Sequence, residues 1–233
     1  MSEKKTSKTR QHIFLALLLL AVPCFILLFG KMKHTFSSLP YYYPEDVVQV
    51  EKDGKMVNDT IWHSIPGFNL INQDSVAIDR SLLDGHISVV DFFFTTCTTI
   101  CPKMTRQTKT LAWMLEGEYF KDVRYLSISV DPEFDVPHVL RDYQKKMESA
   151  HPQWTMATGN KEEIYDLGVN GFKLTTQEDL AAVGGFLHSE KFVLVDKDGH
   201  IRGYYDGTSP DEVRDLAEDI KMLIGEERKG LKE

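Results

Sequence analysis

Cys97 and Cys101 are the residues of this chain whose type and spacing predict chemistry most directly. They follow an apolar run and precede a helical pattern. On a helix, residues four apart share one face, so both sulfurs can reach one metal ion or each other. At a strand-to-helix turn, free N–H groups and the helix dipole stabilise a thiolate, which is both the nucleophile and the metal ligand.

The spacing of the two cysteines differs from the Cys-x-x-Cys motif of thiol oxidoreductases. One extra residue stands between Cys97 and Cys101, and this loosens the tight redox turn. Two soft thiolates suit Cu(I), and an imidazole as third ligand would let the site also hold Cu(II). The pair therefore predicts a copper site, a redox-active dithiol, or one site that serves as both.

A third ligand has to come from among eight histidines. Ligands of α/β proteins gather at the carboxyl edge of the sheet, where Cys97 is expected. In the arrangement proposed below, strand 192–195 starts at that edge, so His188, just before it, is our preferred ligand. His138 follows the second strand and is the main competitor. The following histidines are expected away from this edge: His12, His34, His63, His86 and His200.

The elements that must position these residues follow from the hydrophobic pattern. Residues 87–94 and 123–130 are apolar, β-branched runs typical of buried strands, and helical periodicity follows each of them. The expected helices are 101–118, 137–147, 161–168 and 209–223, with a short strand at 154–156 and a hairpin of 192–195 and 201–205. Strand, helix and strand in this order predict a right-handed parallel crossover. Together with the cysteine pair, the order predicts a thioredoxin-like α/β fold, a central mixed sheet flanked by helices.

Residues 13–30 form an uncharged apolar run just long enough to cross the hydrocarbon core, which is about 30 Å thick. Four basic residues precede this run and two follow it, which predicts a cytoplasmic N-terminus. No small-x-small cleavage site follows closely, so we expect an uncleaved single-pass anchor in the cytoplasmic membrane with the domain on the periplasmic side. The expected organisation is an N-terminus at 1–12, the anchor at 13–30, a linker at 31–59, a domain at 60–225 and a polar tail at 226–233. A small hairpin around Asp53-Gly54 is expected within the linker.

Charge is distributed unevenly along the chain. The formal net charge is −8, and residues 1–34 carry six basic side chains against Glu3, or +5, which leaves −8 − 5 = −13 for the remainder. An acidic domain repels phosphate backbones, so nucleic acid is not expected as a partner, whereas cations and cationic protein surfaces are compatible with it. Taken alone, the charge is better explained as a feature that keeps the domain soluble. Only three cysteines are present, so the chain is no disulfide scaffold.

At these residues the sequence resembles the Sco/SenC family of copper chaperones. The matching stretches are 65–68 (IPGF), 72–74 (NQD), 89–102 (VVDFFFTTCTTICP), 127–132 (SISVDP), His188-Ser189 and 192–199 (FVLVDKDG). The resemblance implies a thioredoxin fold, copper bound by Cys97, Cys101 and His188, and one N-terminal transmembrane anchor. It also implies delivery of copper to, or reduction of thiols at, the dinuclear copper site of cytochrome c oxidase. The implied partners are the copper-site subunit of that oxidase, other periplasmic copper carriers and thiol reductants.

Two positions depart from the family pattern, and one cluster has two interpretations. Ser75 stands where glycine is common, and Leu187 precedes His188 where an acidic residue sometimes occurs. Asp131-Pro132-Glu133, at the end of the second strand, could orient a ligand. As a turn and helix-entry signal, which is the interpretation we favour, it would have no such role.

Three other functions compete for the same motif. A thiol-disulfide oxidoreductase would use Cys97 and Cys101 without a metal. A thiol peroxidase would use Cys101, because residues 98–102 resemble a peroxidatic Thr-x-x-Cys turn on the same fold. Structural zinc is disfavoured, because three protein ligands leave the usual four-coordinate site incomplete.

Overall fold

The computed structural model describes residues 38–52, 54–174 and 190–229. All of them belong to the second of two compact units, Ser38–Glu233, and the first unit is Met1–Ser37. Within the described ranges no helix is long and apolar enough to cross a membrane. The expected anchor at 13–30 lies outside them.

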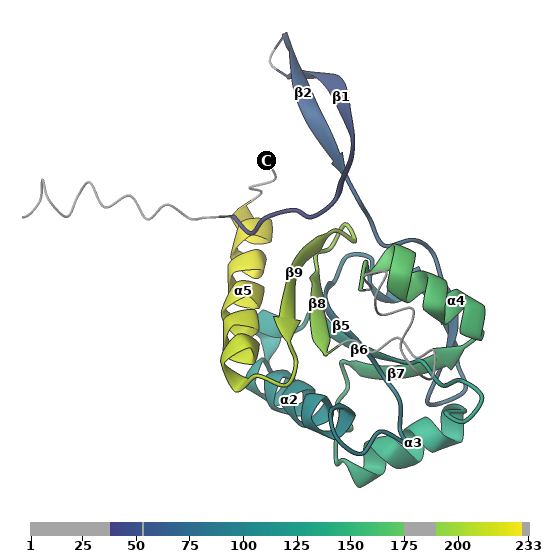
Figure 1. The fold of residues 1–233 in the computed structure, drawn as a ribbon. Helices are drawn as coiled ribbons and strands as arrows, with labels where there is room; N and C mark the ends of the chain where they lie inside the picture. The colour runs from purple at the N-terminus through teal and green to yellow at the C-terminus, as the bar shows by residue number, and fades with distance from the viewer. Residues whose placement is uncertain (1–37, 53, 175–189, 230–233) are drawn as a thin grey trace, which may run out of the picture. The chain divides into compact units, whose positions relative to one another are not determined.

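A seven-stranded mixed sheet forms the centre of the domain, in the order β4-β3-β7-β6-β5-β8-β9. Figure 1 labels its strands β5 to β9. Its strands are β3 (Asn69–Asn72), β4 (Ala77–Asp79), β5 (Ile87–Phe93), β6 (Val123–Ser129), β7 (Trp154–Gly159), β8 (Lys191–Val195) and β9 (Ile201–Asp206). β5, β6 and β7 are parallel, whereas β8 runs antiparallel to β5, and β3 antiparallel to β7. The mixed sheet of the expected thioredoxin-like fold is therefore present.

Helices cover both faces of the sheet. They are α2 (Cys101–Met114), α3 (Pro137–Lys146), α4 (Lys161–Asp166) and α5 (Pro210–Lys229), with short turns η1 (Arg80–Leu82), η2 (Glu118–Phe120) and η3 (Leu167–Gly171). β5 is buried at every position, as its apolar run predicts. Val89 and Phe93 pack in a core with α2, α3 and α5, while Val90 and Phe92 face a second core that includes α4.

The predicted elements are present, but several bounds differ and the edge of the sheet was missed. The strand expected at 154–156 continues to Gly159, and the helix expected at 161–168 ends at Asp166 and is followed by the π-helical turn η3. Strands β3 and β4 were not predicted, because they are only four and three residues long and lie at the exposed edge. Helix α2 ends at Met114, before the expected residue 118, and Gly117 follows with a φ of 110°. Helix α5 continues past the expected end at residue 223 to Lys229, because Glu226 is buried against the domain.

The expected hairpin is also present, as a separate two-stranded sheet of β1 (Pro44–Lys52) and β2 (Lys55–Trp62) (Figure 1). Val50 pairs with Val57 and Lys52 with Lys55. Gly54, in the connection, has a φ of 72°, which a glycine adopts without steric cost.

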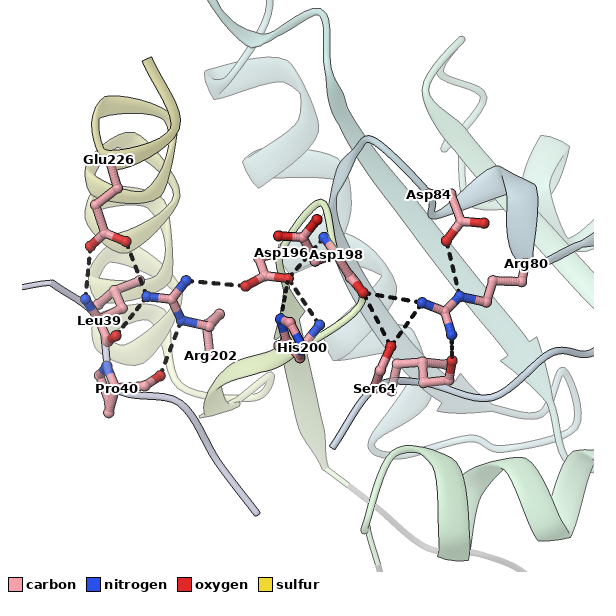
Figure 2. Close-up of polar contacts among 11 residues, drawn as sticks. Leu39, Pro40, Ser64, Arg80, Asp84, Asp196, Asp198, His200, Arg202 and Glu226 are labelled. Atoms are coloured by element: carbon pink, nitrogen blue, oxygen red, sulfur yellow. Dashed lines mark hydrogen bonds and ion pairs between the residues drawn. The ribbon is translucent and has the colours of Figure 1, made fainter. Parts of the chain in front are cut away.

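A buried arginine holds the segment before this hairpin (Figure 2). Arg202 donates to the carbonyl oxygens of Leu39 at 2.6 Å and Pro40 at 3.2 Å. It also pairs with Asp196 at 3.1 Å and Glu226 at 3.0 Å, and all three charged side chains are at least 93% buried. Such a network is stable only when each charge keeps its partners, so it fixes where the chain enters the domain.

A second arginine holds the segment after the hairpin (Figure 2). Arg80 donates to the hydroxyl of Ser64 at 2.8 Å, to the carbonyl of Asp198 at 3.1 Å and to the carbonyl of Ile65. Asp198 belongs to the turn between β8 and β9. Because β8 is antiparallel to β5, this turn lies at the edge of the sheet where β5 begins, opposite the edge where Cys97 follows β5.

The backbone conformation of Ser75 is one that favours glycine, the residue that is common at this position of the family pattern. Ser75 has a φ of 63° in the turn between β3 and β4, where the Asn72 side chain accepts the N–H groups of Asp74 and Val76, both at 2.9 Å. A residue with a Cβ is disfavoured in this left-handed conformation.

We predict that Ser75→Gly raises the free energy of unfolding by about 0.5–1 kcal/mol, because glycine removes the steric cost of the positive φ. Urea unfolding of the full chain measures the change. Ser75→Ala keeps the Cβ and is the matched control, for which no gain is expected. Equal stability of the alanine and glycine variants would show that the turn stores no such strain.

Candidate metal centre

The two cysteines lie at the junction of β5 and α2, as the sequence predicts. Cys101 is the first residue of α2 and is 6% exposed, whereas Cys97 lies in the preceding loop and is partly exposed. The backbone N–H of Cys101 points at the sulfur of Cys97, with an N–S distance of 3.5 Å. One sulfur is thus open to a partner and the other is enclosed by the protein.

The local sequence explains why the sulfur of Cys97 receives this N–H group. The first N–H groups of a helix need acceptors from outside the helix. The cap residue of α2, Ile100, makes no side-chain capping bond, Pro102 is tolerated in the first turn, and the first turn holds no acidic residue. The sulfur of Cys97 therefore takes the place of a capping oxygen.

This position makes Cys97 the thiol that ionises more easily. Partial burial opposes ionisation, but hydrogen bonds from the backbone N–H groups of Cys101, Thr99 and Ile100 and from the Cys101 thiol outweigh it. The pKa of Cys97 is thereby lowered to about 7. Near neutral pH a large fraction of Cys97 is thiolate, the form that binds metals and attacks disulfides.

Cys101 has the opposite character. Burial raises its pKa to about 12, and the neighbouring Cys97 and the carboxyl of Asp91 act in the same direction, against a backbone hydrogen bond from Phe94. Cys101 therefore stays protonated at neutral pH unless a metal or a disulfide replaces the proton. This asymmetry disfavours the peroxidase interpretation, which needs a reactive thiolate at Cys101.

Asp91 is a buried carboxyl group that the sequence predictions passed over. It is 4% exposed and accepts a hydrogen bond of 2.6 Å from the hydroxyl of Ser127, which in turn accepts the indole N–H of Trp154 at 3.0 Å. Burial raises the pKa of Asp91 to about 7, although the hydrogen bond from Ser127 acts to lower it. The available signal was an acidic residue inside an otherwise apolar strand.

The proposed third ligand, His188, lies outside the described residues. The predicted direction of the strand after His188 is confirmed, because β8 pairs antiparallel with β5 and Val193 lies opposite Val90. Lys191, the first residue of β8, thus lies toward the end of β5 that leads to Cys97.

The predicted placement of three other histidines within the described residues is confirmed, whereas His12 and His34 lie outside these residues. His86 precedes β5 at the opposite edge of the sheet and contacts Arg124 at 2.8 Å. His200 lies beside the β8–β9 turn, and His63 is buried between Glu45 and the carbonyl of Gly171, both at 2.7 Å. His138 is exposed in the first turn of α3 and remains the competitor.

Asp131-Pro132-Glu133 forms the turn that we favoured over a ligand-orienting cluster. The carbonyl oxygen of Asp131 accepts the N–H groups of Phe134 at 3.1 Å and Asp135 at 2.8 Å. The carboxylate that contacts the cysteine loop is Asp135, two residues beyond the stretch that the sequence singled out. Only the tertiary structure identifies this contact.

Asp196, Asp198 and His200 are the other group with metal-ligand chemistry, and in the described part of the chain it is the only group of three such residues within 4.8 Å. One oxygen of Asp196 already accepts the N–H groups of Asp198 at 3.0 Å and His200 at 2.9 Å, and the other pairs with Arg202 at 3.1 Å. These bonds give Asp196 a structural role in the turn.

Comparison with known proteins identifies relatives across the domain. The SCO1/SenC family model matches residues 62–225. The "SCO1 protein homolog" of Bacillus subtilis (strain 168) is 31% identical over 169 residues, which make up 72% of this chain and 86% of that protein. The structure of BsSco, "a member of the Sco family of cytochrome c oxidase assembly proteins", is 31% identical with a TM-score of 0.60 and covers 70% of this chain and 94% of that one. Yeast Sco1 with copper bound, at 22% identity and a TM-score of 0.56, covers 73% of this chain and 96% of that one and supports the fold alone.

We predict that iodoacetamide alkylates Cys97 with a midpoint near pH 7, because the thiolate is the reacting form. Cys101 should stay unmodified in the folded chain up to at least pH 9, since its pKa is raised to about 12. Mass spectrometry of peptides from the reduced full chain measures both thiols. Cys97→Ser is the control for site assignment, and faster labelling of Cys101 than of Cys97 would contradict the assigned asymmetry.

A second prediction concerns pH and Asp91. The pKa of an aspartate is about 3.9 in the unfolded chain, whereas that of Asp91 is about 7 in the folded chain. Between about pH 3.9 and about pH 7 the folded chain therefore binds more protons than the unfolded chain, and the free energy of unfolding falls as pH rises. Asp91→Asn should remove this component, whose slope is at most about 1.4 kcal/mol per pH unit. Urea unfolding of both chains between pH 5 and 8 measures the difference. A constant difference in stability across this range would show that Asp91 ionises normally.

Proposed function

Because this chain belongs to the SCO1/SenC family, we propose that it is a copper chaperone for the dinuclear copper site of cytochrome c oxidase. It would bind one copper through Cys97, Cys101 and His188. The observation that carries the proposal is the thiol pair at the start of α2, with an accessible sulfur of lowered pKa beside a buried one. Support for the first two proposed ligands comes from their position beside each other at the start of α2, and the antiparallel direction of β8, the strand after His188, supports the third.

The chemistry of the two sulfurs favours copper as the cargo. Thiolates are soft ligands that suit Cu(I), and an imidazole would allow the same site to hold Cu(II). Metal binding requires Cys101 to lose its proton, so copper uptake would release protons and become weaker as pH falls. The buried side of the site limits access of water to Cys101, while Cys97 stays open to a donor or an acceptor.

The cellular arrangement follows from the anchor predicted at 13–30. We infer that this segment holds the chain in the cytoplasmic membrane and that the domain works on the periplasmic side. Its partners would be the copper-site subunit of the oxidase, other periplasmic copper carriers, and reductants that keep the two thiols reduced. BsSco, a relative at 31% identity, is named as an oxidase assembly protein, which supports this partner.

Thiol-disulfide exchange is the second candidate function, and the asymmetry of the two thiols favours it. An exposed thiol of low pKa suits attack on a disulfide, and a buried neighbour can then resolve the mixed disulfide. The structure of BsSco is reported with a disulfide switch. Reduction of thiols at the oxidase site and delivery of copper could therefore share Cys97 and Cys101.

The test is anaerobic copper loading of the detergent-solubilised full chain, followed by metal counting. We expect about one copper per chain in the wild type, because three ligands make one site. Cys97→Ser and Cys101→Ser should each lose most of this copper, and His188→Ala should lose binding of Cu(II) in particular.

His138→Ala is the matched control, since it removes the competing imidazole and should leave copper binding unchanged. Retention of full loading by the double cysteine variant would end the chaperone hypothesis. Disulfide exchange that survives in His188→Ala would separate the thiol function from the metal function.

A further inference from the structure

A buried carboxylate ties the loop that carries Cys97 to the neighbouring strand. Asp135 lies between β6 and α3 and is 0% exposed. One of its oxygens accepts the backbone N–H of Thr95 at 3.0 Å and the hydroxyl of Ser129 at 2.5 Å, and the other accepts the hydroxyl of Thr95. Three donors from two segments thus converge on one side chain.

We propose that Asp135 is a positioning residue for the metal and dithiol site and acts on Cys97 through Thr95. The inference rests on the proposed function, because it concerns the geometry in which Cys97 and Cys101 hold copper or form a disulfide. It assigns this role to a residue that itself binds neither the metal nor the partner.

Asp135 positions the Cys97 loop through two hydrogen bonds with Thr95. Thr95 follows β5 and stands two residues before Cys97. Because both its backbone N–H and its hydroxyl donate to Asp135, its backbone and its side chain are fixed together. The next turn of the loop is held by the Cys97 N–H, which donates to the carbonyl of Phe94 at 3.3 Å.

The strand end that holds Asp135 is itself well fixed. Val130 donates its N–H to the carbonyl of Phe93 at 2.9 Å, which continues the pairing of β5 with β6. The hydroxyl of Ser129 donates to Asp135 and also accepts the N–H of Asp131 at 3.1 Å. Asp135 therefore links the Cys97 loop, which has no regular secondary structure, to the end of the paired strands β5 and β6.

We expect loss of the Asp135 carboxylate to change the relative position of the sulfurs of Cys97 and Cys101. Without it, both donors of Thr95 and the hydroxyl of Ser129 lack their acceptor in a buried place, and the loop has to move to satisfy them. A displaced loop would change the distance between the sulfurs of Cys97 and Cys101. Outer residues that orient metal ligands typically contribute about 10–100-fold to metal affinity.

The test compares Cu(I) affinity and disulfide potential in the full chain. Cu(I) affinity is measured by competition with the chelator bathocuproine disulfonate, and the potential of the Cys97–Cys101 couple in dithiothreitol redox buffers. We expect Asp135→Asn and Thr95→Val to weaken Cu(I) binding by about 10–100-fold. The couple should become easier to reduce, by about 30 mV for each tenfold change in its equilibrium constant.

Two variants separate positioning from general destabilisation. Thr95→Ser keeps both donors and should restore wild-type affinity and potential, whereas Thr95→Val removes only the hydroxyl. Glu133→Gln is the matched control, because this residue lies in the same turn but is 80% exposed in its side chain and pairs with Lys161 at the surface. It should behave as the wild type.

The outcomes distinguish this inference from the proposed function. A wild-type chain that binds no Cu(I) would refute the chaperone role, and the redox potential would still test Asp135. If the wild type binds Cu(I) and Thr95→Val matches it in affinity and potential, the positioning role is overturned. If Asp135→Asn fails to fold, the Thr95→Val and Thr95→Ser pair decides the question alone.

Discussion

The site depends on one contact, in which the first N–H group of α2 points at the sulfur of Cys97. A helix that lacks a capping side chain leaves N–H groups in need of an acceptor, and here the acceptor is a thiol. The thiolate satisfies them better than the neutral thiol does, which is why Cys97 ionises near pH 7 despite its partial burial. Metal binding or disulfide formation at Cys97 therefore acts directly on the start of this helix.

The two edges of the sheet have different physical roles. At one edge, two arginine networks hold the segments on both sides of the β1–β2 hairpin. The charged groups of the Arg202 network are almost fully enclosed, whereas the Arg80 side chain is 27% exposed. At the other edge, where β5 and β6 end, the Cys97 loop is tied by hydrogen bonds to Asp135 while Cys97 itself stays accessible. The arginine networks thus fix the segments around the hairpin at the edge where β5 begins, opposite the edge that carries the cysteines.

The asymmetry between the sulfurs explains how one site could serve two functions. Cys97 offers a thiolate to whatever approaches, whether a copper ion or a disulfide. Cys101 keeps its proton until the incoming group replaces it, because burial opposes its ionisation. A partner would therefore react first at Cys97, and the bond to Cys101 would form second.

The sequence alone determined what depends on local pattern. The apolar run of residues 87–94 predicted the buried strand β5, and the Asp53-Gly54 turn predicted the hairpin. The spacing of Cys97 and Cys101 predicted a thiol pair at the start of a helix. Each of these predictions reflects the preferences of a few neighbouring residues. Parallel pairing of β5 and β6 likewise followed from the order of elements.

Tertiary structure decided what depends on residues far apart in the chain. The short strands β3 and β4 form because β3 pairs with β7 and β4 pairs with β3. Helix α5 continues past residue 223 because Glu226 pairs with Arg202. Asp135 belongs to the site only because Thr95, 40 residues away, comes within hydrogen-bond distance of it. The hydrophobic periodicity of the sequence cannot predict such a contact, because the two residues meet only when the folded sheet brings them together.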